Sequence, residues 1–196
     1  VTTTSEYNIP LILDHAGSGT GPLFWAHYSF LGLNPTNLSD QYANYWDLNV
    51  NHTNINYQHC VSNPNNYADY GENCWGLTAS YSRNSDGSTG YSAHDPQNDL
   101  GVISPTAAIS SIPYTPETSL AAMHYFYSKK DILMGTAGFY DAFSPQYNDW
   151  VTEQYLAIDQ GPEIIMIENY RTGLFWNLFM QNEDVQNGLN TLGFTY

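Results

Sequence analysis

The sequence predicts an all-α protein. Several long segments repeat apolar residues at intervals of three and four, whereas the alternating pattern of a strand is sparse. No internal repeat and no low-complexity segment is present. A chain of 196 residues is long enough to bury one hydrophobic core and too short for two ordinary domains. We therefore expect one helical domain.

Two helices are expected in the first third of the chain. The stretch LFWAHYSFLGL, residues 23–33, follows a glycine-rich turn and predicts a short helix. A longer helix is predicted over residues 40–61, in which Tyr42 and Trp46 are four residues apart. Ser39 would cap its N-terminus, and the stretch SNPNN would end it.

Residues 63–105 form a long polar, glycine-rich stretch without periodicity. A stretch of this length inside a compact domain usually carries function rather than filling space. We therefore expect loops with binding residues here.

Two more helices are predicted in the middle of the chain. One is short, over residues 106–112. The other covers residues 116–130, with Pro116 in its first turn and Lys129 and Lys130 at its end, where the helix dipole favours cations. Both fit the helical fold class.

A helix from Pro162 to about Met180 carries apolar residues on nearly every face, which predicts that it is buried. Glu168 and Arg171 are three residues apart and share one of its faces. A buried pair of charges must be well hydrogen-bonded, so it either locks two helices together or lines a polar site. Asp159, just before this helix, could cap it or belong to a site. A last short helix is predicted over residues 183–194.

The charge balance narrows the choice of partner. Acidic residues outnumber basic ones 19 to 4, and the net charge is −15. Such a field repels nucleic-acid phosphates and anionic lipids, and no apolar run is long enough to span a membrane. A neutral ligand such as a carbohydrate fits better, although the acidity could equally serve solubility. The chain starts at Val1 without a signal peptide, so we expect a processed chain or a piece of a longer one.

Several acidic residues lie next to aromatic rings. Glu72 is near Trp75, Asp95 follows His94, and Asp141 lies in the stretch FYDAFS. Glycoside hydrolysis needs one protonated carboxyl group and one carboxylate, and rings both stack on sugars and raise the pKa of a carboxyl group by desolvation. These residues therefore favour a carbohydrate-active site.

The histidines and cysteines leave alternatives open. Cys60 and Cys74 could form a disulfide or remain buried thiols. His52 and His59 are seven residues apart, but no further ligand completes a tight set, so we expect no metal and no cofactor. His27 and the pair Asp14–His15 could contact substrate or form hydrogen bonds in the core.

The chain resembles the glucoamylase-like family of α/α-toroid glycoside hydrolases, which includes bacterial endo-β-1,2-glucanases. The resemblance covers most of residues 14–181, in the order of the family. It is carried by the stretches GPLFWAHYSFLGLNP, GENCWGLTAS, GYSAHDPQNDLGVISPTAAISSIPYTPETSLAAMHYFY, GFYDAFS and YLAIDQGPEIIMIENYRTGLFWNLFM.

The resemblance implies an (α/α)6 toroid and the hydrolysis, with inversion, of a β-linked glucan, with endo-hydrolysis of β-1,2-glucan as the best-known case. Asp141 and Asp159 are the candidate catalytic residues, either being the base. The candidate substrate-binding residues lie in the motifs that match the family or beside them: His27, Tyr28, Glu72, Trp75, Tyr91, His94, Asp95 and Tyr140. Glu168 and Arg171 would support Asp159 from behind.

Catalytic domains of the family are about twice as long as this chain. The resemblance implies that residues 1–196 are the C-terminal part of one catalytic domain, with about half of the toroid helices. The general acid would then lie in a missing N-terminal half, which would be a partner of this chain. Two alternatives are a glycan-binding module without turnover and a transglycosylase on the same linkage. A periplasmic or extracellular location is expected.

Overall fold

The fold is that of a computed structural model, which describes residues 3–12 and 19–196. Asp14 and His15 lie outside the described residues. The helices are α1 (Phe24–His27), α2 (Tyr45–Ser62), α3 (Pro105–Ser110), α4 (Pro116–Ser128), α5 (Lys130–Leu133), α6 (Ala157–Thr172), α7 (Leu174–Met180) and α8 (Glu183–Leu192), with 3-10 turns η1 (Tyr28–Phe30) and η2 (Pro145–Tyr147). None of the described helices is long and apolar enough to cross a bilayer.

The prediction of an all-α fold is wrong in one respect, because small sheets accompany the helices. The strands are β1 (Thr3–Glu6), β2 (Ile9–Ile12), β3 (Ala79–Arg83), β4 (Thr89–Ala93), β5 (Met134–Gly135), β6 (Gly138–Phe139), β7 (Phe143–Ser144) and β8 (Trp150–Val151). They form four separate antiparallel pairs, each of two strands in sequence order.

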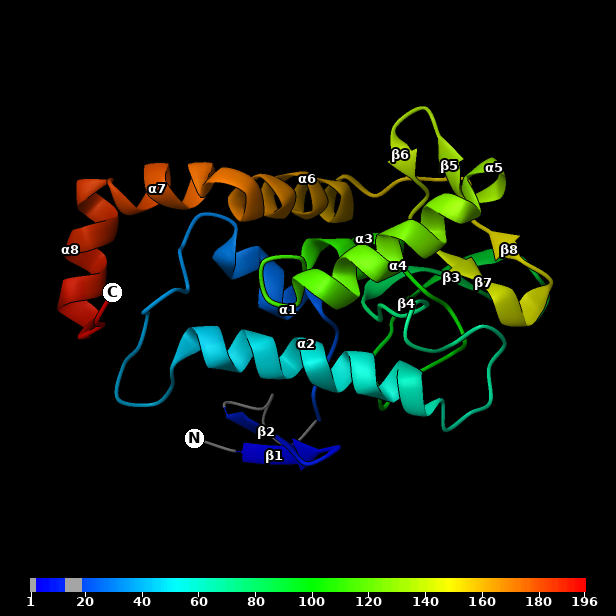
Figure 1. The fold of residues 1–196 in the computed structure, drawn as a ribbon, viewed down its shortest axis with the longest axis horizontal. Coiled ribbons are helices and arrows are strands. Elements are labelled where there is room, and N and C mark those ends of the chain that lie inside the picture. The colour runs from blue at the N-terminus through cyan, green and yellow to red at the C-terminus, as the bar shows by residue number, and fades with distance from the viewer. Residues whose placement is uncertain (1–2, 13–18) are drawn as a thin grey trace.

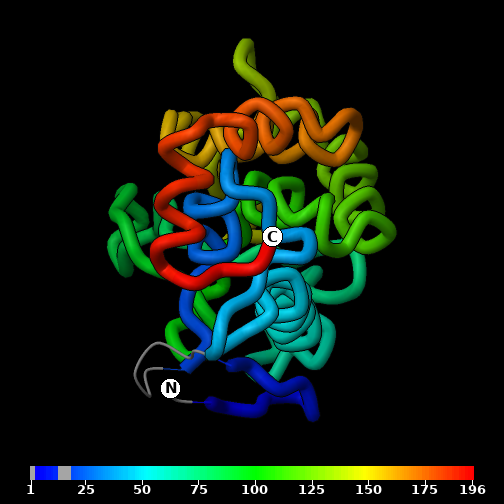
Figure 2. Tube along the Cα trace, turned by 90° about the vertical axis from the view of Figure 1, so that its left-hand side faces the viewer, coloured from blue at the N-terminus to red at the C-terminus, as the bar shows by residue number. Residues whose placement is uncertain are grey.

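The helices are arranged in layers. In Figure 1, α6 and α7 run end to end along one side, α2 runs along the opposite side with the β1–β2 pair beyond it, and α1, α3 and α4 lie between them. The short strand pairs β5–β6 and β7–β8 gather at one end, and α8 turns across the other. Figure 2 shows the same separation of α6 and α7 from α2 when the molecule is viewed from the α8 end.

The main core lies between these layers. It is built around the fully buried rings of Trp75, Phe126 and Phe143. A second cluster joins Met166 of α6 and Trp176 of α7 to the segment of α1, and so fixes α6 against the middle layer.

The predicted helix boundaries are partly confirmed. α2 begins at Tyr45 rather than at residue 40, because Asn44 caps it by accepting the backbone N–H of Asp47. α4 begins at Pro116 as predicted. The helix expected to run on to Met180 is instead interrupted at Gly173, whose φ of 69° lies in the left-handed region.

One predicted interaction differs in the structure, and one open alternative is decided. The Arg171 guanidinium donates to Glu168 over 2.9 Å, but this pair lies on the surface, with 67% of the Arg171 side chain exposed. It neither locks two helices together nor supports Asp159. Cys60 and Cys74 are both buried and both free.

Candidate active site

Asp141 is held in place by the backbone of the short strands. It lies between β6 and β7, and its N–H donates to the carbonyl of Gln154 over 3.0 Å. Its side chain is fully buried, and its Oδ2 accepts the backbone N–H of Tyr81 in β3 over 2.8 Å. The carboxyl group is therefore fixed from two sides.

Asp159 reaches the same place from the first turn of α6. It is 4% exposed, and its Oδ1 accepts the hydroxyl hydrogen of Tyr28 over 3.0 Å. The predicted alternative of a helix cap is wrong, because the N-terminus of α6 has no side-chain cap.

The two carboxyl groups lie close enough that each shifts the pKa of the other. One oxygen of each group, Asp141 Oδ1 and Asp159 Oδ2, is buried without a hydrogen-bond partner among the described residues. Two buried carboxylates this close cannot both be ionised at low cost.

Burial is the main cause that raises the pKa of both groups. The hydrogen bond from Tyr28 opposes this effect at Asp159, and the N–H of Tyr81 opposes it at Asp141. The interaction between the two carboxyl groups raises the pKa of Asp141 further and lowers that of Asp159. The two groups titrate as a pair, and the hydroxyl hydrogen of Tyr28 stabilises the ionised form of Asp159.

Tyrosines surround the pair. Tyr81 and Tyr91 are directly opposite each other in the β3–β4 pair. The side chain of Tyr91 is 61% exposed, and its pKa is raised by partial burial and by the nearby charges of Asp159 and Asp141. An exposed ring next to a buried carboxylate can stack on a sugar while the carboxylate acts on it.

Tyr140 is the aromatic residue directly before Asp141 in the chain. It stacks on Tyr155, with ring centroids 5.3 Å apart. Gly135 allows this arrangement, because a Cβ there would lie 2.3 Å from the hydroxyl of Tyr155. Of the predicted binding residues, Tyr28, Tyr91 and Tyr140 thus lie near the two aspartates.

His27 lies behind the site rather than in it. It is 2% exposed, and its Nε2 lies 2.9 Å from the hydroxyl oxygen of Ser111. Burial lowers its pKa to about 3, so the ring is neutral. Together with Asp159 and Tyr28 it lines a small cavity of about 10 Å³. The prediction that His27 contacts substrate is therefore corrected.

The prediction that Trp75 and His94 bind substrate is also corrected, because neither side chain is exposed. The Trp75 ring packs edge-on against Tyr57 in the core, and its indole N–H donates to the carbonyl of Thr118 over 3.3 Å. Burial lowers the pKa of His94 to about 4. An aromatic residue in a polar loop looks like a binding residue in sequence, but here the loop folds back over the core.

Glu72 and Asp95 do not lie beside Asp141 and Asp159 either. Glu72 is exposed and lies near Tyr57 of α2. Asp95 closes a turn by accepting the backbone N–H groups of Gln97 and Asn98 over 2.8 and 2.7 Å. Neither is among the charges that shift the pKa of Asp141 or Asp159.

One group at the site was missed, the backbone N–H of Tyr81. It leaves no trace in the sequence, because every residue except proline carries such a donor. Glu163, one helical turn beyond Asp159, was not predicted either, and burial raises its pKa to about 7. It is not among the groups that shift the pKa of Asp141 or Asp159.

The comparisons with known proteins identify the class to which this fold belongs. Residues 2–183 match the Glycoamylase family, described as "Putative glucoamylase". The chain belongs to this family, and the resemblance predicted from its sequence is confirmed.

Three relatives illustrate the similarity. The chain is 44% identical over 178 residues to the exo beta-1,2-glucooligosaccharide sophorohydrolase (non-reducing end) of Parabacteroides distasonis, covering 89% of this chain and 24% of the relative. It is 51% identical to the endo-beta-1,2-glucanase of Chitinophaga pinensis, solved with sophorotriose and glucose, with a TM-score of 0.92. It is 55% identical to a "putative glucoamylase" of Bacteroides uniformis, also with a TM-score of 0.92.

The match with the two solved structures covers the whole of this chain but 46% of each of theirs. The chain thus spans between a quarter and a half of the length of these relatives.

Proposed function

We propose that this chain is the C-terminal part of a glycoside hydrolase that cleaves β-1,2-glucan by endo-hydrolysis with inversion. The observation that carries the proposal is the buried pair of Asp141 and Asp159 next to the exposed ring of Tyr91. The named activities of two relatives, both on β-1,2-linked glucose, support the choice of linkage.

Asp159 is the base in this proposal. Tyr28 holds it through one oxygen and favours its ionised form. It takes a proton from the water that attacks the anomeric carbon. Asp141 supplies no proton to the sugar, but its interaction with Asp159 favours the ionised form of that group.

The general acid has to come from elsewhere. In an inverting glycosidase the acid and the base are roughly 6.5–9.5 Å apart, because the sugar and a water lie between them. Asp141 and Asp159 lie close enough to shift each other's pKa, so in this proposal they do not flank the bond as an acid–base pair. We place the acid in the part of the protein that precedes this sequence.

Residues 1–196 would then supply about half of the helices of an (α/α)6 toroid, with the rest of the same catalytic domain as their partner. The cleft would bind β-glucan oligosaccharides. The location that we propose for the protein is periplasmic or extracellular.

The test is the release of reducing ends from β-1,2-glucan by the full-length protein. Asp159→Asn should lower kcat by about 100-fold or more, the size of a lost general base. Asp131→Asn, a change of the same kind on the exposed surface of α5, should leave kcat unchanged. Inversion predicts that the α-anomer appears first in the product, which proton NMR can follow.

Other results would select other functions. Full activity of Asp159→Asn would rule out the base that we propose. Calorimetry that shows binding of gluco-oligosaccharides without any product would indicate a glycan-binding module. Products longer than the substrate would indicate a transglycosylase.

A further inference from the structure

A small polar cavity lies beside Asp159, between α1, α3 and α6. Its volume is about 10 Å³. Thr106 of α3 and Asp159 of α6 both line it and are 1% and 4% exposed. Most of the lining residues carry polar side chains, namely His27, Tyr28, Thr78, Thr106, Ser110 and Asp159.

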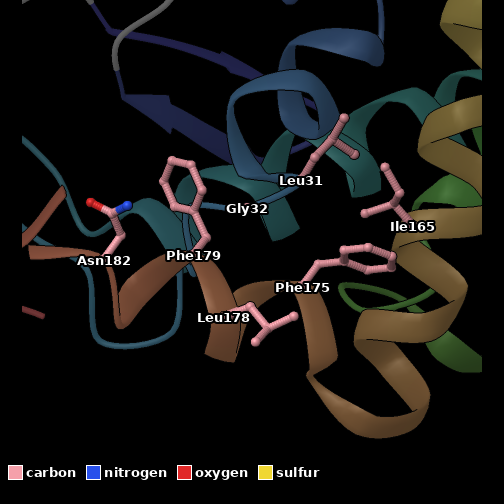
Figure 3. A pocket seen from close by; sticks show the side chains of 7 residues that line it. All are labelled: Leu31, Gly32, Ile165, Phe175, Leu178, Phe179 and Asn182. Atoms are coloured by element: carbon pink, nitrogen blue, oxygen red, sulfur yellow. The ribbon is translucent and has the colours of Figure 1, made fainter. Parts of the chain in front are cut away.

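The size and the polarity of this cavity fit a single water molecule. A cavity needs roughly 10–15 Å³ to hold a water, and an internal water bonds to about three polar groups. The groove in Figure 3 is the opposite case, since its volume is about 380 Å³ and Asn182 has its only polar side chain. Among the described residues, no buried side-chain atom that lacks a partner belongs to the lining of that groove.

Two buried oxygens of residues that line the small cavity have no hydrogen-bond partner among the described residues. They are Oδ2 of Asp159 and Oγ1 of Thr106. The other oxygen of Asp159 accepts from Tyr28, and Oγ1 of Thr78 accepts the backbone N–H of Phe24 over 3.2 Å. An unpaired buried oxygen is costly, and more costly when it carries charge. One molecule in the cavity can be the partner of both oxygens.

We propose that this cavity holds one water, which donates to Oδ2 of Asp159 and accepts from the hydroxyl group of Thr106. Its second hydrogen can go to the hydroxyl oxygen of Thr78 or Ser110 in the same lining. Tyr28 then holds one oxygen of the carboxylate and the water holds the other. Thr106 acts through this water and is a positioning residue for Asp159.

Other occupants fit this cavity less well. A sugar ring is too large for a volume of about 10 Å³. An anion would meet the negative charge of Asp159. A metal cation needs several strong ligands, and the described residues contain no group of three His, Cys, Asp or Glu side chains that could hold one.

The water also has a consequence for the chemistry of Asp159. A hydrogen bond donated to a carboxylate favours its ionised form. Without the hydroxyl group of Thr106 the water loses one of its partners, so it is held less firmly and Asp159 becomes harder to ionise. The water site rests on the geometry of this chain, whereas its effect on catalysis rests on the proposed function.

The first test is a high-resolution crystal structure of the full-length protein. It should show one water roughly 2.6–3.2 Å from both Oδ2 of Asp159 and Oγ1 of Thr106. A cavity without density for a water would overturn the proposal, and so would a water that reaches only one of the two oxygens. This test needs no substrate and no activity.

The second test is the pH dependence of kcat in the full-length enzyme. Thr106→Val has nearly the shape of threonine but no hydroxyl group. The acidic limb of its profile should move up by roughly 0.5–1 pH unit, which lowers kcat about 3- to 10-fold on that limb and leaves it within about twofold near pH 8. Thr106→Ser keeps the hydroxyl group and should keep the profile of the wild type.

Thr53→Val is the matched control. It also removes a buried hydroxyl group without a partner among the described residues, but from α2, away from the lining of the cavity. An unchanged profile in Thr106→Val would overturn the role of Thr106, as would the same shift in Thr53→Val. An equal loss of kcat at every pH would mean that Thr106 acts through packing alone.

Failure of the proposed function gives a different result. If the wild type does not cleave β-1,2-glucan, the proposed function fails, and crystal structures still decide the water site. The water should then be present in the wild type and Thr106→Ser and lost or displaced in Thr106→Val. A water that stays in place in Thr106→Val would show that Thr106 does not hold it.

Discussion

Asp141 has an environment that favours function over stability. Its carboxyl group is fully buried beside Asp159, and burial raises its pKa. A group whose pKa is raised by folding stabilises the fold below its unfolded pKa, near 4, and this contribution is lost as the pH rises toward the folded pKa. At neutral pH the pair therefore destabilises the protein.

Asp141→Asn should consequently stabilise the fold at neutral pH. Its amide can still accept from the N–H of Tyr81 and donate to Asp159. We expect a gain of roughly 0.5–2 kcal/mol at pH 7.5 that disappears near pH 3.5, measured by urea unfolding. A variant less stable than the wild type at pH 7.5 would show that the pair is not a source of strain.

Tyr28 stabilises the ionised form of Asp159 through its hydroxyl group. Tyr28→Phe should therefore raise the pKa of Asp159 and move the acidic limb of the pH–rate profile to higher pH. We expect kcat to fall by about 10- to 100-fold, the value of a hydrogen bond to a charged group. The kinetics of the full-length enzyme from pH 4 to 8 would measure both effects.

Tyr45→Phe is the matched control. It also removes a hydroxyl group that donates to a carboxylate, that of Asp40, over 3.0 Å. Asp40 is not among the groups that affect the carboxyl pair. A pH profile that moves in Tyr45→Phe but not in Tyr28→Phe would contradict the assignment.

At the scale of elements, Gly173 determines where α6 ends. Its φ of 69° turns the chain between α6 and α7, and its N–H donates to the carbonyl of Asn169 over 2.9 Å. This turn directs Phe175 and Trp176 toward the loop after η1. The sequence shows a glycine there but gives no sign that the helix breaks, because the apolar pattern continues on both sides.

Gly173→Ala should destabilise the chain by about 1 kcal/mol, because alanine is strained in the left-handed region and its Cβ would lie 3.2 Å from Asn177. Gly188→Ala, inside α8, should instead stabilise it by roughly 0.5–1 kcal/mol, since its Cβ meets nothing within 4 Å. Urea unfolding of both variants measures the difference. Effects of the same sign would refute the role given to Gly173.

The helices were easier to predict than the strands, for a physical reason. α4 and α8 carry local signals, namely a proline in the first turn and a periodic apolar pattern. The strands β3 and β4 hold residues of mixed polarity such as Ser80 and Thr89. Their pairing depends on contacts between segments, which a local pattern does not record.

At the scale of the whole molecule, the excess of acidic residues opposes folding through self-repulsion. The net charge is −15. Between 0.01 and 0.15 M salt the screening length falls from about 30 to about 8 Å, so repulsion over long distances weakens. The Tm of the 196-residue chain should rise by roughly 2–5 °C over this range.

Scanning calorimetry in sodium chloride would measure this rise. Added salt also weakens the attraction within an ion pair, and this effect lowers the Tm. One such pair is Lys129 and Asp69, whose Nζ and Oδ2 are 3.1 Å apart. A Tm that falls with salt would mean that such pairs outweigh the general repulsion.

The sequence by itself determined the family, most of the helices and the two aspartates, because apolar periodicity and short motifs are local. Only the tertiary structure decided that Asp141 and Asp159 come together as a buried pair while Trp75 and His94 belong to the core. It also decided that one side of α6 and α7 is left open. Burial and proximity arise when distant segments pack together, and the identity of a residue does not fix them.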